Sequence, residues 1–284
     1  MIHVNNLVYR YPGRTEDTIK GVTFQVNKGE IFGFLGPSGA GKSTIQKILI
    51  GILKGYNGSV KIDHQELNTL DSMYLERIGV GFEFPNFYHK FTGLENLSFF
   101  SRLYKSKTRN PMELLEQLGL KDAGNLKFSN YSKGMKMRLN FCRVLLNDPD
   151  IMFLDEPTSG LDPVNNNNLR ELIKAEKAKG KTILITTHNM STAEELCDRV
   201  AFIVDGSISL IDSPHNLKIK DGKKEVKVEY RDNTGVKIDR FPLNGLSENS
   251  AFQTILKNNE IITMHTQEAT MEDIFIKATG RELV

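Results

Sequence analysis

Nine consecutive residues near the N-terminus have the composition of a phosphate-binding loop. They fit the pattern G-x-x-x-x-G-K-[ST], in which glycines allow backbone N–H groups to turn inward around a polyphosphate. In this pattern Lys42 contacts the β- and γ-phosphates, Ser43 offers its hydroxyl to Mg²⁺, and Thr44 extends the same helical turn. The residues are Gly36, Pro37, Ser38, Gly39, Ala40, Gly41, Lys42, Ser43 and Thr44.

The residues on both sides of this loop favour the same interpretation. An apolar run from residue 30 to 35 predicts a buried parallel strand. Apolar residues at helical spacing then predict a helix that continues through Ile52 and Leu53. A chance glycine-rich turn is the alternative, but it would not require a strand before it and a helix after it.

Two carboxylates follow a second apolar run, residues 151–154. In a phosphate-loop protein, Asp155 belongs on Mg²⁺ and Glu156 can polarise the water that attacks the γ-phosphate. The alternative is that they cap the next turn. Residues 181–187 predict another buried strand, which ends at His188. That side chain either contacts the γ-phosphate or is a structural histidine.

Other segments predict the architecture around these motifs. Residues 2–10 and 22–26 alternate as antiparallel strands do, and residues 93–127 have helical spacing. Beyond residue 215 the pattern indicates a small α+β unit without catalytic motifs. Tyr11 either stacks on a flat ligand such as adenine or packs at a strand end, and spacing alone favours packing.

The composition limits the classes of partner. The formal net charge is only +2, which provides no electrostatic footprint for nucleic acid. No apolar run approaches the roughly 18 residues of a membrane span, so we expect a soluble chain whose membrane role requires a partner. Cys142 and Cys197 show no metal-ligand pattern, and we expect reduced core thiols.

Five aromatic residues are concentrated in one short segment. Such a cluster either packs under the following helices or contacts a partner, and the sequence does not distinguish these alternatives. The five residues are Phe82, Phe84, Phe87, Tyr88 and Phe91.

A polar loop at residues 131–135 opens a predicted helix and forms a second candidate anion site. With this loop, the phosphate loop and Asp155-Glu156 in this order, residues 1–212 resemble the ATPase subunit of ABC transporters. The resemblance implies an α/β fold. It comprises a P-loop NTPase core with an antiparallel β subdomain, an inserted helical subdomain at about 84–140, and a C-terminal accessory α+β domain at 213–284.

The resemblance also assigns residues that spacing alone does not. It implies ATP as the nucleotide, with Tyr11 stacked on adenine and His188 as the switch histidine. Ser132 and Gly134 would meet the γ-phosphate of a partner's ATP, and residues 159–162 would form the dimer-contact loop.

Two features depart from the family pattern. Tyr131, Lys133 and Met135 stand where leucine, glycine and glutamine are usual. Glu83 replaces the usual glutamine, and an ionised carboxylate only accepts hydrogen bonds. We therefore expect Glu83 to act on Mg²⁺ or on the attacking water.

The implied function is to power a membrane transporter, most similar to an exporter of drugs, antibiotics or other amphipathic compounds. The resemblance implies a head-to-tail homodimer that ATP closes and hydrolysis opens. Its partner would be a separate membrane-spanning subunit, which docks at residues 84–91. The chain would then be cytoplasmic, peripheral at the inner face of the cell membrane.

Three alternatives remain from the sequence. They are a soluble ABC ATPase acting on ribosomes or nucleic acid, the ATPase of an importer, and a binding module with negligible hydrolysis. The near-neutral charge disfavours a role on ribosomes or nucleic acid. The presence of Asp155, Glu156 and His188 disfavours a binding module with negligible hydrolysis.

Overall fold

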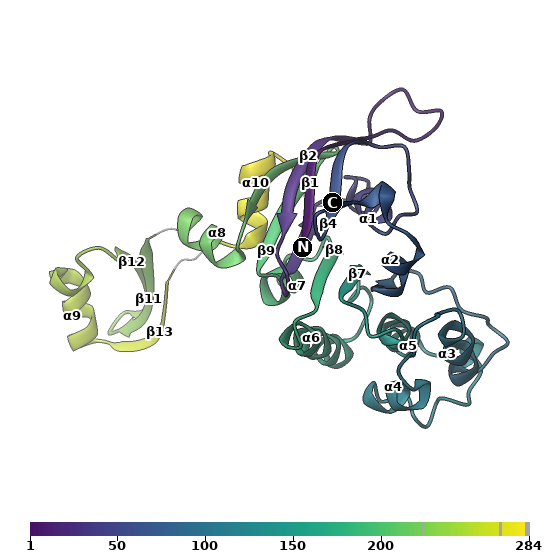
Figure 1. Ribbon diagram of the computed structural model, residues 1–284. Helices are drawn as coiled ribbons and strands as arrows, with labels where there is room; N and C mark the ends of the chain where they lie inside the picture. The colour runs from purple at the N-terminus through teal and green to yellow at the C-terminus, as the bar shows by residue number, and fades with distance from the viewer. Residues whose placement is uncertain (223, 267–268, 282–284) are drawn as a thin grey trace. The chain divides into compact units, whose positions relative to one another are not determined.

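The central sheet has six strands, and five of them run parallel (Figure 1). Their sequences are apolar because parallel strands are covered on both faces. The order is β10, β9, β3, β8, β7, β6, with β10 antiparallel to β9. The carboxyl ends of the parallel strands meet at one edge, where the predicted motifs lie. The bounds are β3 (Ile31–Leu35), β6 (Ile78–Gly81), β7 (Ile151–Asp155), β8 (Thr182–Thr187), β9 (Arg199–Val204) and β10 (Ser207–Asp212).

A second sheet of four antiparallel strands has the order β2, β1, β4, β5. Alternate residues of β1 and β2 are buried, as their sequences predicted, except where the register shifts between Val4 and Leu7 of β1. Strand β2 begins three residues before the alternation suggested. The buried side chains join one hydrophobic cluster with those of the phosphate-loop helix. The bounds are β1 (Ile2–Tyr9), β2 (Ile19–Val26), β4 (Asn57–Ile62) and β5 (Gln65–Glu66).

The helix after the phosphate loop, α1 (Lys42–Leu49), is shorter than predicted. Gly51 has a φ of +78° and turns the chain away, so Ile52 is 58% exposed. The expectation that the helix continues through Ile52 and Leu53 was wrong. Spacing alone did not identify the glycine that ends it.

The inserted helical subdomain contains α3 (Gly93–Ser101), α4 (Pro111–Gln117) and α5 (Lys133–Leu145), which group together in Figure 1. The preceding aromatic segment is only partly buried, so packing accounts for some of its rings, and contact of the others with a partner stays a prediction. Phe87 is 6% exposed and packs on neighbouring rings, whereas Phe84 and Tyr88 are 75% and 49% exposed.

Three further helices and two short 3₁₀ turns complete this part of the chain. Asp162 caps the start of α6, since its side chain accepts a hydrogen bond from Asn165 N. The bounds are α2 (Ser72–Glu76), α6 (Pro163–Ala178), α7 (Met190–Leu196), η1 (Leu67–Thr69) and η2 (Phe128–Asn130).

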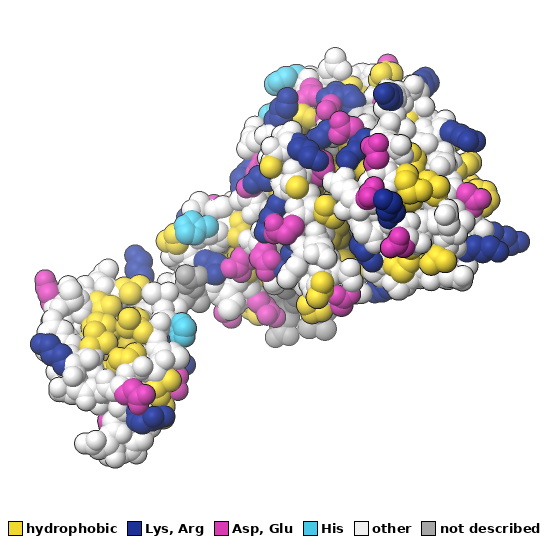
Figure 2. Space-filling view, turned by 90° about the horizontal axis from the view of Figure 1, so that it is seen from below, with side chains coloured by type: hydrophobic (Ala, Val, Ile, Leu, Met, Phe, Trp, Pro, Cys, Tyr) yellow, Lys and Arg dark blue, Asp and Glu magenta, His cyan; other side chains and the backbone are white. Residues whose placement is uncertain are grey.

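Residues Pro214–Gly280 form a second unit, separate from Met1–Ser213. Its three-stranded antiparallel sheet packs against α9 through an apolar cluster that includes Val228 and Phe252. Hydrophobic side chains gather on one face of this unit (Figure 2). The bounds are α8 (Pro214–Asp221), β11 (Glu225–Asp232), β12 (Gly235–Pro242), η3 (Leu246–Glu248), α9 (Ser250–Asn258), β13 (Glu260–Thr266) and α10 (Met271–Thr279).

This computed structural model describes residues 1–222, 224–266 and 269–281, so the end of the predicted C-terminal domain lies outside the described residues. Within those ranges, no helix has the length and apolar character needed to cross a membrane. Both cysteines are free and buried, as expected.

Candidate nucleotide-binding site

The phosphate loop connects β3 to α1 and wraps around the Lys42 side chain. Lys42 Nζ donates hydrogen bonds to the carbonyls of Gly36 at 2.6 Å and Pro37 at 3.0 Å. A Cβ on Gly36 would lie 2.1 Å from the Ile203 carbonyl oxygen, so this position requires glycine. Burial lowers the pKa of Lys42, and the nearby carboxylates oppose that shift.

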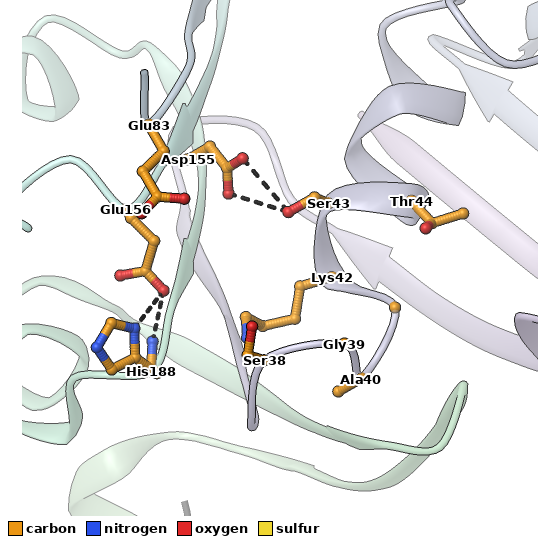
Figure 3. A pocket seen from close by; sticks show the side chains of 11 residues that line it. Ser38, Gly39, Ala40, Lys42, Ser43, Thr44, Glu83, Asp155, Glu156 and His188 are labelled. Carbon is orange, nitrogen blue, oxygen red and sulfur yellow. Dashed lines mark hydrogen bonds and ion pairs between the residues drawn. The ribbon is translucent and has the colours of Figure 1, made fainter. Parts of the chain in front are cut away.

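The side chains of Ser43 and Asp155 lie side by side, an arrangement that would suit a magnesium site (Figure 3). Ser43 Oγ is 3.3 Å from both carboxylate oxygens of Asp155, and the Thr186 hydroxyl donates to the same carboxylate. One hydroxyl and one carboxylate fit Mg²⁺, which commonly combines few protein oxygens with phosphate oxygens. Among the described residues, no group of three His, Cys, Asp or Glu side chains forms a metal site by itself.

Glu156 is held firmly at the end of β7. One of its oxygens, Oε1, accepts from the backbone N–H of His188 at 2.9 Å and lies 2.7 Å from His188 Nδ1. The other, Oε2, accepts from the Thr187 hydroxyl at 3.0 Å. Glu156 is only 8% exposed and has a φ of +46°, an unfavourable conformation for a residue with a Cβ. These bonds fix the carboxylate at the pocket wall.

Thr186 and Thr187 were missed by the sequence analysis. Both are buried in the last two positions of β8, at 1% and 0% exposure. Each hydroxyl donates to one of the two acidic residues that end the neighbouring strand. The available signal was two polar residues directly after the apolar run 183–185 of a buried strand.

Glu83 lies beyond the end of β6 and lines the same pocket as Asp155 and Glu156. Desolvation raises the pKa of Glu83, and the negative charges of Asp155 and Glu156 raise it further. His188 and Lys133 act in the opposite direction. The pocket therefore holds three acidic side chains, and Glu83 binds its proton more tightly than an ordinary glutamate does.

The pocket has a volume of about 460 Å³ and is open to solvent. It brings together Lys42 and the phosphate loop on one wall with three acidic residues on the other (Figure 3). Such a site can bind a polyphosphate with Mg²⁺ and orient a water molecule for attack. Its walls are residues 38–44, Glu83, Asp155, Glu156 and His188.

Tyr11 lies beside the phosphate loop but is not part of the pocket wall. Its hydroxyl is 3.2 Å from Thr44 Oγ1, and its ring packs edge-on against Tyr9 with the centroids 5.1 Å apart. Stacking on adenine remains a prediction.

Ser132 and Gly134 also lie outside the pocket, at the start of α5. Ser132 caps this helix, because its hydroxyl accepts from Met135 N at 3.2 Å. The Lys133 side chain covers Gly160, since a Cβ on that glycine would fall 1.8 Å from Lys133 Nζ. The loop at residues 131–135 is thus packed against the predicted dimer-contact loop.

Comparisons with known proteins agree with this geometry. Residues 19–159 match the ABC transporter family, and residues 224–268 match a family described as the fluoroquinolone efflux ABC transporter C-terminal domain. A fluoroquinolones export ATP-binding protein of Mycobacterium tuberculosis (strain H37Rv) is 50% identical over 284 residues, covering 100% of this chain and 94% of the relative. A Nod factor export ATP-binding protein I of Burkholderia lata is 34% identical over 282 residues, covering 93% of each chain.

Solved structures agree as well. A dimeric ATP-binding cassette in a post-hydrolysis state, bound to ADP and Pi, is 28% identical with a TM-score of 0.67, covering 75% of this chain and 99% of that chain. An ATP-binding subunit of an ABC transporter is 28% identical with a TM-score of 0.69, covering 78% and 92%. The predicted α/β P-loop fold is confirmed.

Proposed function

Because this chain belongs to the family of ATP-binding subunits of ABC transporters, we propose that it powers the export of amphipathic drugs of the fluoroquinolone type. ATP hydrolysis is the expected activity of the family, and the relatives named above are export proteins. Export is therefore favoured over import and over a role on ribosomes or nucleic acid. The observation that carries the ATPase part of the proposal is the pocket in which Lys42, Asp155 and Glu156 converge.

In this proposal Glu156 is the general base for the attacking water. Its carboxylate accepts hydrogen bonds from the Thr187 hydroxyl and the backbone N–H of His188, and it also contacts His188 Nδ1. These contacts hold the carboxylate in one orientation. Lys42 and the backbone N–H groups of the loop would stabilise the charge that develops on the phosphoryl oxygens. His188 would contact the γ-phosphate from the same wall.

We propose that Mg²⁺ is held by Ser43, Asp155 and the nucleotide phosphates. Ser43 and Asp155 are already side by side, and both supply the hard oxygen ligands that Mg²⁺ prefers. Glu83 would act on the ion or its water from the same acidic wall as Asp155 (Figure 3). The ion supplies charge neutralisation at the phosphates when bound.

A head-to-tail homodimer would complete each site. Ser132 and Gly134 lie outside their own pocket, which supports a role against the nucleotide of a second copy. A twofold dimer of this chain would contain two such composite sites. Removal of the γ-phosphate would break the contacts that hold it closed.

We propose that the membrane-spanning subunit docks on an apolar groove beside the helical subdomain, and that the chain is thereby peripheral at the membrane. The groove has a volume of about 370 Å³. Phe82 lines it while the next residue, Glu83, lines the nucleotide pocket. The lining includes Ile50, Leu75, Phe82, Phe100, Leu103 and Arg143.

The exposed aromatics Phe84 and Tyr88 would extend the docking surface. Phe87 is buried, so a polar residue there would damage the fold and could not test docking. We expect Phe84→Ser with Tyr88→Ser to retain ATPase activity but to lose transport. If ATPase activity and transport were lost equally in a folded variant, Phe84 and Tyr88 would not be part of the docking surface.

The cargo class rests on the match of residues 224–268 and on the mycobacterial relative. The test is accumulation of a fluoroquinolone in drug-sensitive cells that express this chain with its membrane subunit. We expect lower accumulation with the wild type than with Glu156→Gln. Equal accumulation would remove this cargo class.

The membrane subunit itself can be identified by pull-down of tagged Glu156→Gln from solubilised membranes with ATP and Mg²⁺. A polytopic membrane protein in comparable amount supports the transporter role. Recovery of ribosomal or nucleic-acid partners alone would contradict it while leaving the ATPase intact.

A further inference from the structure

The segment that carries Glu83 is held from the helical subdomain by Asn140 of α5. Asn140 Nδ2 donates to the Phe82 carbonyl at 2.9 Å, and Asn140 Oδ1 accepts from Arg143 Nη2 at 2.9 Å. Asn140 is 4% exposed. A buried amide is costly unless it is bonded, and both ends of this one are used.

Arg143 holds the same segment a few residues later. Its Nη1 donates to the Asn86 carbonyl at 3.2 Å, and its guanidinium lies 4.9 Å from the centroid of the Phe87 ring. The carbonyls of residues 82 and 86 are thus both bonded to α5. Glu83 lies between these two anchors.

The helix that provides these anchors is packed directly on β6. A Cβ on Gly79 would lie 2.4 Å from the Val144 carbonyl oxygen, so glycine is needed for this approach. The same helix begins at Lys133, immediately after its cap Ser132. A displacement of α5 would therefore be transmitted to the backbone next to Glu83 through a hydrogen bond.

We propose that Asn140 is a positioning residue, which holds the Phe82 backbone and thereby keeps the Glu83 carboxylate in the pocket beside Asp155 and Glu156. It acts through Glu83 and does not touch the nucleotide. The inference deepens the proposed function, since ATP hydrolysis is its readout. It also connects the placement of Glu83 to the helix that begins at the predicted partner-contact loop.

Two substitutions separate the bonds of Asn140. Asn140→Asp keeps the shape and the acceptor for Arg143, but a carboxylate has no N–H to donate to Phe82. Asn140→Ala removes both bonds. We expect both variants to lower kcat about tenfold, the effect of losing roughly 1.4 kcal/mol of positioning, and to require more Mg²⁺ for half-maximal activity.

Asn147 provides the matched control. It is 8% exposed, and its Nδ2 donates to the carbonyls of Glu76 and Ile78 at 2.9 Å each, at the opposite end of β6. Asn147→Ala should lower the melting temperature as Asn140→Ala does, with wild-type kcat and Mg²⁺ dependence. Equal kinetic loss in both variants would overturn the proposal in favour of a general structural role.

The decisive measurement is a double-mutant cycle with Glu83→Gln on the full chain. If Asn140 acts through Glu83, Asn140→Asp should have little further effect on kcat or Mg²⁺ dependence in the Glu83→Gln background. Additive losses would overturn the inference while leaving an active ATPase. If the pull-down recovered no membrane subunit, or if drug export were not observed, the proposed function would be contradicted. The role of Asn140 in positioning Glu83 would not be affected by either result.

Discussion

The nucleotide pocket and the C-terminal unit use polar residues in opposite ways. In the pocket, Glu156 and Thr187 are almost completely buried and bonded to each other. In the C-terminal unit, Arg231 and Glu260 form an ion pair with 57% and 68% exposure, while the buried set is apolar. Exposed pairs contribute little to stability, whereas buried polar networks are costly to assemble. The comparison therefore indicates that polar burial at the pocket serves chemistry.

The largest expected effect is from Glu156→Gln. The amide keeps the shape but cannot accept a proton, so we expect kcat to fall about 10²- to 10⁴-fold, the usual contribution of a general base. ATP binding should persist, and the variant should accumulate as an ATP-bound dimer. Steady-state ATPase assays and size-exclusion chromatography measure these outcomes. Wild-type turnover would assign the base elsewhere, with Glu83 as the next candidate.

The next effect is from Thr187→Val, which removes the hydroxyl that orients Glu156. A hydrogen bond to a charged group contributes about 1.5–3 kcal/mol, so kcat should fall at least about tenfold. Thr182→Val on the same strand is the control, because Thr182 is also buried and its hydroxyl accepts from Gly29 N at 3.0 Å. Thr182→Val should lower stability without lowering kcat. A similar loss of kcat in both would mean that β8 packing, and not the Glu156 bond, controls the rate.

Much of this site could be predicted because its residues follow strands whose apolar runs are distinct. Asp155 and Glu156 were assigned from the end of a strand together with the upstream phosphate loop, whereas His188 needed the family resemblance as well. Parallel strands bring such ends to one edge of the sheet. Thr187 and Asn140 could not be assigned, because their roles depend on which neighbour lies opposite them. The end of α1 was also missed, since it depends on the φ of one glycine.

A smaller effect is expected from Glu83→Gln, and it depends on pH. Because the pKa of Glu83 is raised, acidification protonates it earlier than an ordinary glutamate and removes a negative charge near Mg²⁺. The Mg²⁺ affinity of the wild type should therefore decrease as the pH falls from about 7 toward about 5. Glu83→Gln should bind Mg²⁺ more weakly at neutral pH and lose this additional dependence. Identical pH profiles would mean that Glu83 does not act on the ion.

The smallest effect on hydrolysis is expected from Val228→Asp in the C-terminal unit. Val228 is completely buried beneath α9, so an unpaired carboxylate should destabilise this unit by about 3 kcal/mol or more. Hydrogen exchange across residues 225–266 should increase, while kcat stays within about twofold of wild type, because none of the pocket residues belongs to this unit.

Val236→Asp is the matched control for this last prediction. Val236 lies on the neighbouring strand β12 but is 52% exposed, so the same substitution should change stability by less than about 0.5 kcal/mol. If Val228→Asp abolishes ATP hydrolysis and Val236→Asp does not, the fold of the C-terminal unit is required for the reaction. The comparison between the nucleotide pocket and the C-terminal unit would then fail. The apolar core of the C-terminal unit would be needed to maintain the hydrogen-bonded residues of the pocket.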